Sequence, residues 1–238
     1  MSVLTRVGHG IASGLWRLLL AVLIIDLFYV WQLWHERPVL ETGPVPMSRF
    51  ISDQRTRGGL NTSRWEPIAI EKIPAHVVRA VLIAEDGRFY SHAGFDFTAI
   101  QHAINVNMER RRIAFGASTI SQQTAKNLYL TPERSWLRKW HEALLTVTLE
   151  VLVSKRRILE IYLNTAQFGR GVFGVQAAAR HYWSKPVALL SLRQAAELAA
   201  ALPSPGSANP NARSAFFRSH ADKIYRRLQR VHNRSGEI

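Results

Sequence analysis

The sequence predicts a mostly α-helical protein in which a single N-terminal membrane helix precedes a folded domain. Residues 15–34 form one largely apolar run, long enough to cross a bilayer as a helix. Elsewhere apolar side chains recur at helical spacing, and no segment shows a convincing alternation of apolar and polar residues. The 238 residues can hold one good-sized core or two small lobes.

The composition narrows the class of partner. Lys and Arg number 31 against 17 Asp and Glu, a net charge of +14, which favours nucleic acid, an acidic membrane surface or a phosphorylated substrate. The chain has no cysteine, which excludes a disulfide framework, a thiolate nucleophile and a cysteine-bound metal.

The apolar run has the features of an uncleaved anchor. Tyr29, Trp31 and Trp34 form an aromatic belt at its far end, and no small-x-small cleavage site follows. Asp26 near its centre costs about 3 kcal/mol on insertion scales, so we expect it to have a polar partner or locally wet surroundings.

Basic residues near the run indicate its orientation. Arg6 and Arg17 place residues 1–14 in the cytoplasm, although Arg37 and Arg49 on the other side weaken this signal. The remainder of the chain then faces outward, which argues against a nucleic-acid partner.

The segment after the anchor predicts no regular structure. Pro38, Pro44 and Pro46 punctuate the polar stretch 35–66, so we interpret it as a linker or an irregular membrane-proximal element. Residues 67–238 would then form the folded domain.

The first candidate for chemistry is Glu85. Pro74 suits a first helical turn and Gly87 a left-handed C-cap, so the spacing predicts a helix that stops at Gly87 with Glu85 in its final turn. The helix carbonyls and the nearby Phe89 would both raise the pKa of Glu85, as a general base near neutral pH requires. The alternative is an ordinary surface carboxylate at a helix end.

A second stretch predicts a binding face. Thr119 and Gln122 have capping-box spacing, which would leave the backbone N–H groups around Ser118 and Thr119 pointing outward toward an anion. Thr119, Gln122, Gln123 and Lys126 share one helix face that ends in a cation and suits a phosphate-bearing sugar. The alternative is a solvated, glutamine-rich face.

Residues 135–153 predict a long amphipathic helix. Glu142 lies off its apolar stripe and can form an ordinary exposed ion pair with Arg138 or Lys139. The stripe expected to face the core comprises Leu137, Trp140, Leu144, Val147 or Thr148, and Val151.

Side-chain caps locate further helices. Asp96, Ser154 and Ser191 are each expected to be the N-cap of a helix that begins at the next residue. A basic helix over 212–232 closes the chain. The glycine-rich turn 168–174 has no preceding strand, which argues against a dinucleotide site.

Four ordered motifs, within about 78–210, carry a family resemblance. They are Glu85-Asp86-x-x-Phe89-x-x-His92-x-Gly94, Gly116-x-Ser118-Thr119-x-x-Gln122-Gln123-x-x-Lys126-Asn127, Arg138-Lys139-x-x-Glu142 and Lys155-Arg156-Arg157-Ile158-Leu159-Glu160-x-Tyr162-Leu163-Asn164. Together they resemble the peptidoglycan glycosyltransferases of the family-51 type. The monofunctional biosynthetic transglycosylases are a closer match than the bifunctional penicillin-binding proteins.

The resemblance implies a lysozyme-like domain of two lobes, one embedded in the membrane, with a cleft between them. It implies a donor glycan on undecaprenyl pyrophosphate and lipid II as acceptor. Glu85 would take the proton from the acceptor GlcNAc 4-hydroxyl while that oxygen attacks the donor anomeric carbon with inversion. Lys126 and Arg134 would neutralise the departing pyrophosphate.

Other roles follow from the same resemblance. Ser118, Gln122 and Gln123 would position the pyrophosphate, and Glu142 would be a second catalytic carboxylate that orients a cation or the basic residues. No metal ligands are assigned, and a divalent cation such as Mg²⁺ at the pyrophosphate stays open. The expected location is a bacterial inner membrane, crossed once, with the catalytic domain in the periplasm and cell-division or elongation proteins as candidate partners.

The activity expected is glycan polymerisation without peptide cross-linking, because the sequence contains no Ser-x-x-Lys and no Lys-Thr-Gly. Two alternatives stay open. A lysozyme-like enzyme could cleave glycan with Glu85 as general acid, although the cations and the anchor would then have no clear purpose. A basic, membrane-anchored scaffold would need none of the candidate residues.

Overall fold

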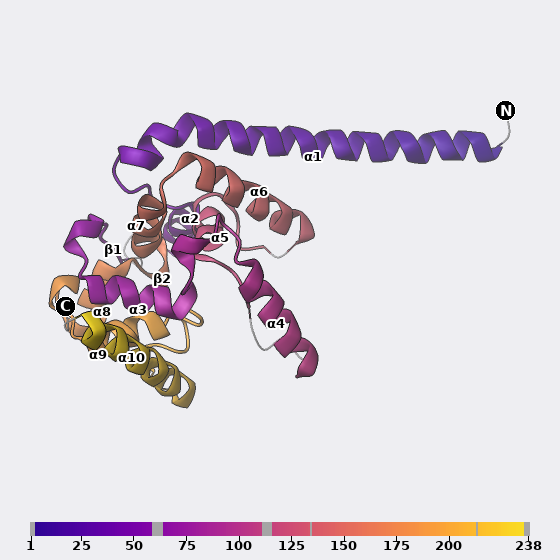
Figure 1. Cartoon of the computed structure of the whole chain (residues 1–238). Helices are drawn as coiled ribbons and strands as arrows, with labels where there is room; N and C mark the ends of the chain where they lie inside the picture. Colours follow the sequence, from indigo (N-terminus) through magenta and orange to yellow (C-terminus); the bar gives the residue numbers. More distant parts are fainter. Residues whose placement is uncertain (1–2, 59–63, 111–115, 134, 213, 236–238) are drawn as a thin grey trace.

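The computed structural model describes residues 3–58, 64–110, 116–133, 135–212 and 214–235, and most of these are helical (Figure 1). This confirms the predicted mostly α class. The helices are α1 (Val3–Thr42), α2 (Arg49–Gly58), α3 (Ala75–Glu85), α4 (Phe97–Glu109), α5 (Ile120–Tyr129), α6 (Trp136–Leu152), α7 (Lys155–Thr165), α8 (Val175–Trp183), α9 (Leu192–Ala200) and α10 (Ala215–Ser235). Short strands are β1 (Arg64–Trp65), β2 (Gln167–Gly169) and β3 (Val172–Phe173).

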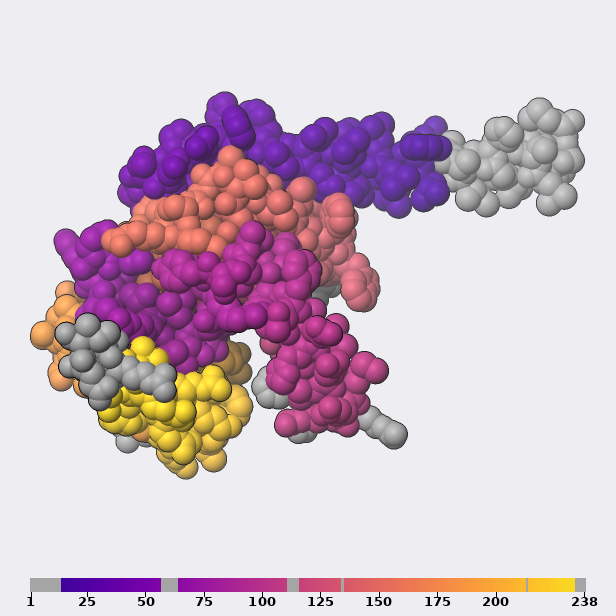
Figure 2. Space-filling view, viewed as in Figure 1, coloured from indigo at the N-terminus to yellow at the C-terminus, as the bar shows by residue number. Residues whose placement is uncertain are grey.

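Helix α1 extends well beyond the body of the protein (Figures 1 and 2). Its stretch Gly14–Thr42 contains an 18-residue window with a mean hydropathy of 1.8 and is long and apolar enough to cross a membrane. Large side chains such as Trp16 and Phe28 are exposed on it. A water-facing helix would not leave so many apolar groups uncovered, so α1 fits a membrane anchor.

Asp26 of α1 has the polar partners that we expected from the sequence. Trp140 Nε1 donates a 2.9 Å hydrogen bond to Asp26 Oδ2, and His141 Nε2 lies 3.2 Å from Oδ1. Both partners belong to α6, which packs along α1. The acid that is costly in the middle of an apolar run therefore joins the anchor to the folded domain.

The prediction that 35–66 is irregular is wrong over 35–42 and 49–58, which are helical, whereas 43–48 has no regular structure. Helix α1 continues through Pro38, and α2 follows it with Ile51 fully buried. Proline costs an interior helical hydrogen bond, but the buried guanidinium of Arg157 caps the end of α1 by donating to the carbonyls of Leu40 at 2.7 Å and Gly43 at 2.6 Å. Tertiary contacts thus hold a helix that the local composition disfavours.

The body of the protein is built around two groups of helices. Helices α3, α9 and α10 pack on one another, and α5 packs between α6 and α7 (Figure 1). Ala195, Ala196 and Ala199 of α9 are fully buried, and their small side chains allow a close helix approach. Helix α4 projects from this body (Figure 2).

The structure contains a small sheet that was not predicted from the sequence. Its strand order is β1-β3-β2, with β1 parallel and β2 antiparallel to β3. Strands of two or three residues are too short to show an alternating pattern. The sheet is followed by Gly174 at φ +81, where a Cβ would lie 2.7 Å from the carbonyl oxygen of Asn164, so glycine is required there.

The predicted caps are confirmed. Asp96 accepts from the Ala99 amide, Ser154 from the Arg157 amide and Ser191 from the Gln194 amide, each at the start of the expected helix. Short polar side chains satisfy the free N–H groups of a first turn, which is why these starts were readable from sequence.

Helix α6 is amphipathic, but the face expected to be buried is exposed. Of the predicted stripe, Val151 is 76% exposed and Leu137, Trp140 and Val147 are exposed as well, while Leu144 is half-buried. The buried face instead carries His141, Glu142, Leu145, Thr146, Leu149 and Leu152. A hydrophobic stripe does not reveal whether it faces a protein core or lipid, and here polar side chains take the inner positions.

Candidate active site

Glu85 is the last residue of α3, as predicted, but the cap beyond it differs. Asp86 is the C-cap with φ −160, and Gly87 does not adopt the left-handed conformation that the sequence suggested. Burial raises the pKa of Glu85 above its usual range. A hydrogen bond from Gln123 and the charge of Lys126 oppose this shift, while the neighbouring Asp86 charge adds to it.

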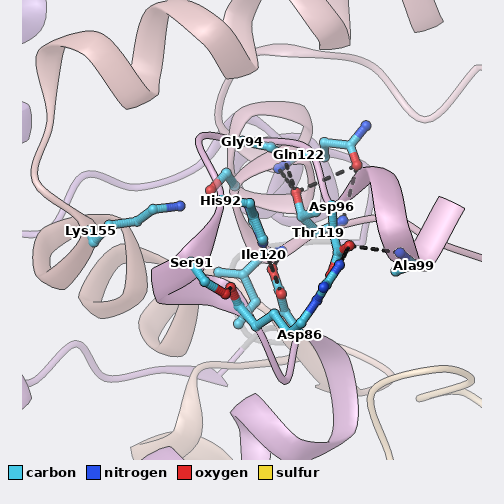
Figure 3. Close-up of polar contacts among 12 residues, drawn as sticks. Asp86, Ser91, His92, Gly94, Asp96, Ala99, Thr119, Ile120, Gln122 and Lys155 are labelled. Carbon is cyan, nitrogen blue, oxygen red and sulfur yellow. Dashed lines mark hydrogen bonds and ion pairs between the residues drawn. The ribbon is translucent and has the colours of Figure 1, made fainter.

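Asp86 ties the end of α3 to the start of α5 (Figure 3). Its carboxylate accepts a 3.0 Å hydrogen bond from the Ile120 amide and lies 3.0 Å from His92 Nε2. Asp96 lies beside this pair and is held by the Arg88 guanidinium. This network fixes the backbone that directly follows Glu85.

Asp86, His92 and Asp96 come within 4.8 Å of one another, close enough to share a metal ion. They do not fit one. Arg88 already neutralises Asp96 and holds its pKa at about 2, and the Asp96 carboxylate also caps α4. The cluster is therefore a structural ion-pair network.

The capping box at the start of α5 is confirmed, but its consequence is corrected. The Thr119 amide donates to Gln122 Oε1 at 3.0 Å and the Gln122 amide donates to Thr119 Oγ1 at 3.2 Å. With the Ile120 amide bonded to Asp86, these N–H groups point into the protein and not toward an outside anion. The buried Gln122 side chain thus caps its own helix.

Gln123 connects Glu85 to α7. Its Nε2 donates a 2.7 Å hydrogen bond to Glu85 Oε2, and its Oε1 accepts a 3.2 Å hydrogen bond from the Tyr162 hydroxyl. Tyr162 is fully buried. The structure therefore brings Gln123 to Glu85 and separates it from Gln122, although both were expected on one binding face.

A cavity of about 400 Å³ opens beside this pair, and two of its lining residues are cations, Lys126 and Arg138. Burial lowers the pKa of Lys126, and the nearby charges of Arg138 and Lys139 lower it further, while Glu142 and Glu85 raise it. Its other lining residues include Phe50, Gln123, Asn127, Thr131, Tyr162 and Gln167. Such a polar, cationic hollow suits a phosphate group.

Glu142 forms the ion pairs predicted for it, but they are not exposed. Arg138 Nη1 donates a 2.9 Å hydrogen bond to one carboxylate oxygen, and Lys139 contacts the other. The Glu142 side chain is only 4% exposed. A carboxylate held by two cations orients them.

Ser118 does not line the cationic cavity. It lines a cavity of about 270 Å³ together with Glu85, Asp86, Arg88 and neighbouring residues. Glu85 lines this cavity and Gln123 lines the cationic one, so their hydrogen bond joins the two hollows. Arg134, the second cation assigned to the leaving group, lies outside the described residues.

Sequence reasoning did not assign Arg138, Asn127, Tyr162 or Phe50 to the site. The first three belong to the motifs quoted above, so their places in those motifs were the available signal. Phe50 had no signal, because it lies on α2 in the stretch interpreted as a linker.

The fold and the site define a helical protein with one helix that could span a membrane and one carboxylate of raised pKa near a cationic cavity. A family model described as transglycosylase matches residues 53–232. A biosynthetic peptidoglycan transglycosylase of Dechloromonas aromatica (strain RCB) is 45% identical over 200 residues, 81% of this chain and 86% of the relative. One from Pasteurella multocida (strain Pm70) is 46% identical over 190 residues, 78% and 77% of the two chains.

The chain therefore belongs to the transglycosylase family, and its helical domain is lysozyme-like, as the resemblance implied.

Proposed function

We propose that this protein polymerises the glycan of peptidoglycan, with lipid II as acceptor and an undecaprenyl-pyrophosphate-linked glycan as donor. The observation that carries the proposal is the Gln123–Glu85 hydrogen bond, which sets a proton-accepting carboxylate between a cationic cavity and a second polar cavity. Transfer of a sugar from a pyrophosphate needs these two functions side by side.

In the proposed reaction Glu85 accepts the proton of the GlcNAc 4-hydroxyl as that oxygen forms a bond to the donor anomeric carbon. The bond from this carbon to the pyrophosphate oxygen breaks on the opposite face, so the configuration inverts. The raised pKa of Glu85 suits a base that works near neutral pH. Ser118 and Gln123 contribute polar groups on the two sides of the carboxylate.

The leaving pyrophosphate would enter the cavity lined by Lys126 and Arg138. Arg134 follows α5 closely in sequence and is proposed to add a further cation there. Glu142 is proposed to hold Arg138 and Lys139 in place, which agrees with its short contacts to both. Fixed cations stabilise developing phosphate charge most when the protein has already oriented them.

The proposed location is a bacterial inner membrane, with the N-terminus in the cytoplasm and the catalytic domain in the periplasm. Helix α1 supplies the span. The apolar residues exposed on α6, with Phe97, Ile104 and Met108 exposed on α4, suit a lobe that dips into lipid. A C-terminal tag should be cleaved by protease added to intact spheroplasts, and a protected tag would contradict the orientation. Binding to cell-division or elongation proteins stays a prediction from the resemblance.

Polymer formation from labelled lipid II by the purified full-length protein tests the activity. We expect glycan strands to form without any other enzyme. Shortening of preformed strands without polymerisation would favour a glycan-cleaving enzyme. If lipid II were not polymerised and preformed strands were not shortened, a scaffold would be favoured.

A further inference from the structure

A third cavity lies between the anchor and the folded domain, away from the residues proposed for catalysis. It has a volume of about 560 Å³ and is walled by α1, α2 and the end of α5. Its apolar lining includes Ile25, Phe28, Val39, Leu40, Met47 and Leu128, and its polar lining is Tyr29, Gln32, Glu36, Arg49, Ser52 and Tyr129.

The polar end of this cavity carries two opposite charges that do not neutralise each other. Glu36 and Arg49 both line it, yet among the described residues neither forms an ion pair. Tyr129 separates them, because its hydroxyl donates to Glu36 Oε2 at 2.7 Å and its carbonyl accepts from Arg49 at 3.3 Å. Glu36 Oε1 also accepts a 3.0 Å hydrogen bond from Gln32 Nε2. Each charge still keeps unused hydrogen-bonding capacity, since a carboxylate accepts about four hydrogen bonds and a guanidinium donates five.

The apolar end matches the depth of a lipid chain. Ile25 and Phe28 lie within the apolar run of α1, and Glu36 lies beyond its aromatic belt. The helical rise puts Ile25 and Glu36 about 16 Å apart along α1. Half of a bilayer's hydrocarbon core is about 15 Å thick, so the charges reach head-group level when Ile25 reaches the acyl chains.

We propose that this cavity binds one phospholipid with a zwitterionic head group that carries a primary ammonium. The phosphate contacts Arg49, the ammonium donates to Glu36, and an acyl chain runs along Ile25 and Phe28. The volume suits the head group and the first part of the chains. This lipid is neither donor nor acceptor: it fills the joint between anchor and domain, behind the helix that carries Lys126 on its other side.

Native mass spectrometry of the full-length protein in detergent tests the proposal with three lipids of matched chains. We expect retention of one phosphatidylethanolamine at least tenfold more readily than phosphatidylcholine, whose quaternary ammonium cannot donate a hydrogen bond. Phosphatidylglycerol, which has no cation for Glu36, should also be retained at least tenfold less readily. Equal retention of all three lipids, or preference for phosphatidylglycerol, would overturn the proposal.

Two variants assign the charges. Glu36→Gln keeps an acceptor for Tyr129 and should abolish the preference for phosphatidylethanolamine. Arg49→Gln should lower the retention of all three lipids by about tenfold, the loss expected for one charge-assisted contact. Glu41→Gln and Arg37→Gln are matched controls, because that exposed pair lies on α1 but does not line the cavity. The ratio between lipids within one sample stays informative when a variant folds in lower yield. An unchanged ratio in Glu36→Gln would refute the ammonium contact.

Discussion

The side-chain amide of Gln123 donates a 2.7 Å hydrogen bond to the Glu85 carboxylate. The Tyr162 hydroxyl donates to the oxygen of the same amide, so the amide nitrogen is turned toward Glu85. Three helices, α3, α5 and α7, thereby fix one proton-accepting oxygen. A hydrogen bond to the charged form lowers a carboxyl pKa, whereas burial raises it. Gln123 therefore limits the rise in the pKa of Glu85 that burial causes.

Gln123→Leu should move the acid limb of polymerisation to higher pH. The substitution removes the hydrogen bond that lowers the Glu85 pKa and leaves burial, which raises it. Initial rates measured between pH 4.5 and 8.5 check this. Tyr162→Phe is the control, because it keeps the Gln123–Glu85 contact and should shift the limb less. An unmoved limb in Gln123→Leu would show that Glu85 is not the titrating base.

Glu85→Gln should lower polymerisation by about 10²–10⁴-fold, the usual loss when a general base is removed. Lipid II binding should persist, because the amide keeps the shape of the side chain. In Glu142→Gln the acid limb should survive with reduced amplitude, since Glu142 is held by two cations. If the limb vanished in Glu142→Gln and survived in the residual activity of Glu85→Gln, the two roles would be reversed.

Lys126→Ala should lower turnover by about 10²–10³-fold, the scale for losing one preorganised group that stabilises developing charge. Substrate binding should weaken less. Parallel measurements of kcat and of lipid II affinity separate the two effects. Arg156→Ala is the matched control, because Arg156 is a surface cation paired with Glu71 and lines neither cavity. Weaker binding with unchanged turnover would make Lys126 an anchor for the substrate only.

The purified chain should not be labelled covalently by a fluorescent penicillin. No Ser-x-x-Lys nucleophile motif occurs in the sequence, and β-lactams acylate such a serine. Gel fluorescence against a bifunctional penicillin-binding protein as positive control measures this. A labelled band that disappears when the protein is boiled before incubation would contradict the prediction that the protein has no transpeptidase activity.

Asp96→Asn should destabilise the protein by up to about 1 kcal/mol at neutral pH, the range for an ion pair whose arginine is half-exposed. The Asp96 pKa is lowered from 3.8 to about 2, chiefly by the Arg88 hydrogen bond, so its stabilisation is complete above pH 3.8 and is lost as the pH falls through 2. Urea unfolding at pH 6, 4 and 2.5 should show wild type and variant converging. A constant difference would mean that the charge is not responsible.

The sequence alone determined the helical class, one helix long and apolar enough to cross a membrane, the helix starts marked by side-chain caps and the residues of the four motifs. These follow from local physics, because side-chain caps and apolar periodicity act within one or two turns. It also placed Glu85 at a helix end and paired Glu142 with Arg138 and Lys139.

Only the tertiary structure decided which faces meet. The apolar stripe of α6 is exposed, and Gln122 is drawn into its own cap while Gln123 reaches Glu85. Arg157 extends α1 through Pro38, and α2 brings Phe50 into the site. These outcomes depend on contacts between residues far apart in the chain, so no local pattern encodes them. When two faces of a helix have comparable hydrophobicity, only the elements that pack against each face decide which one is buried.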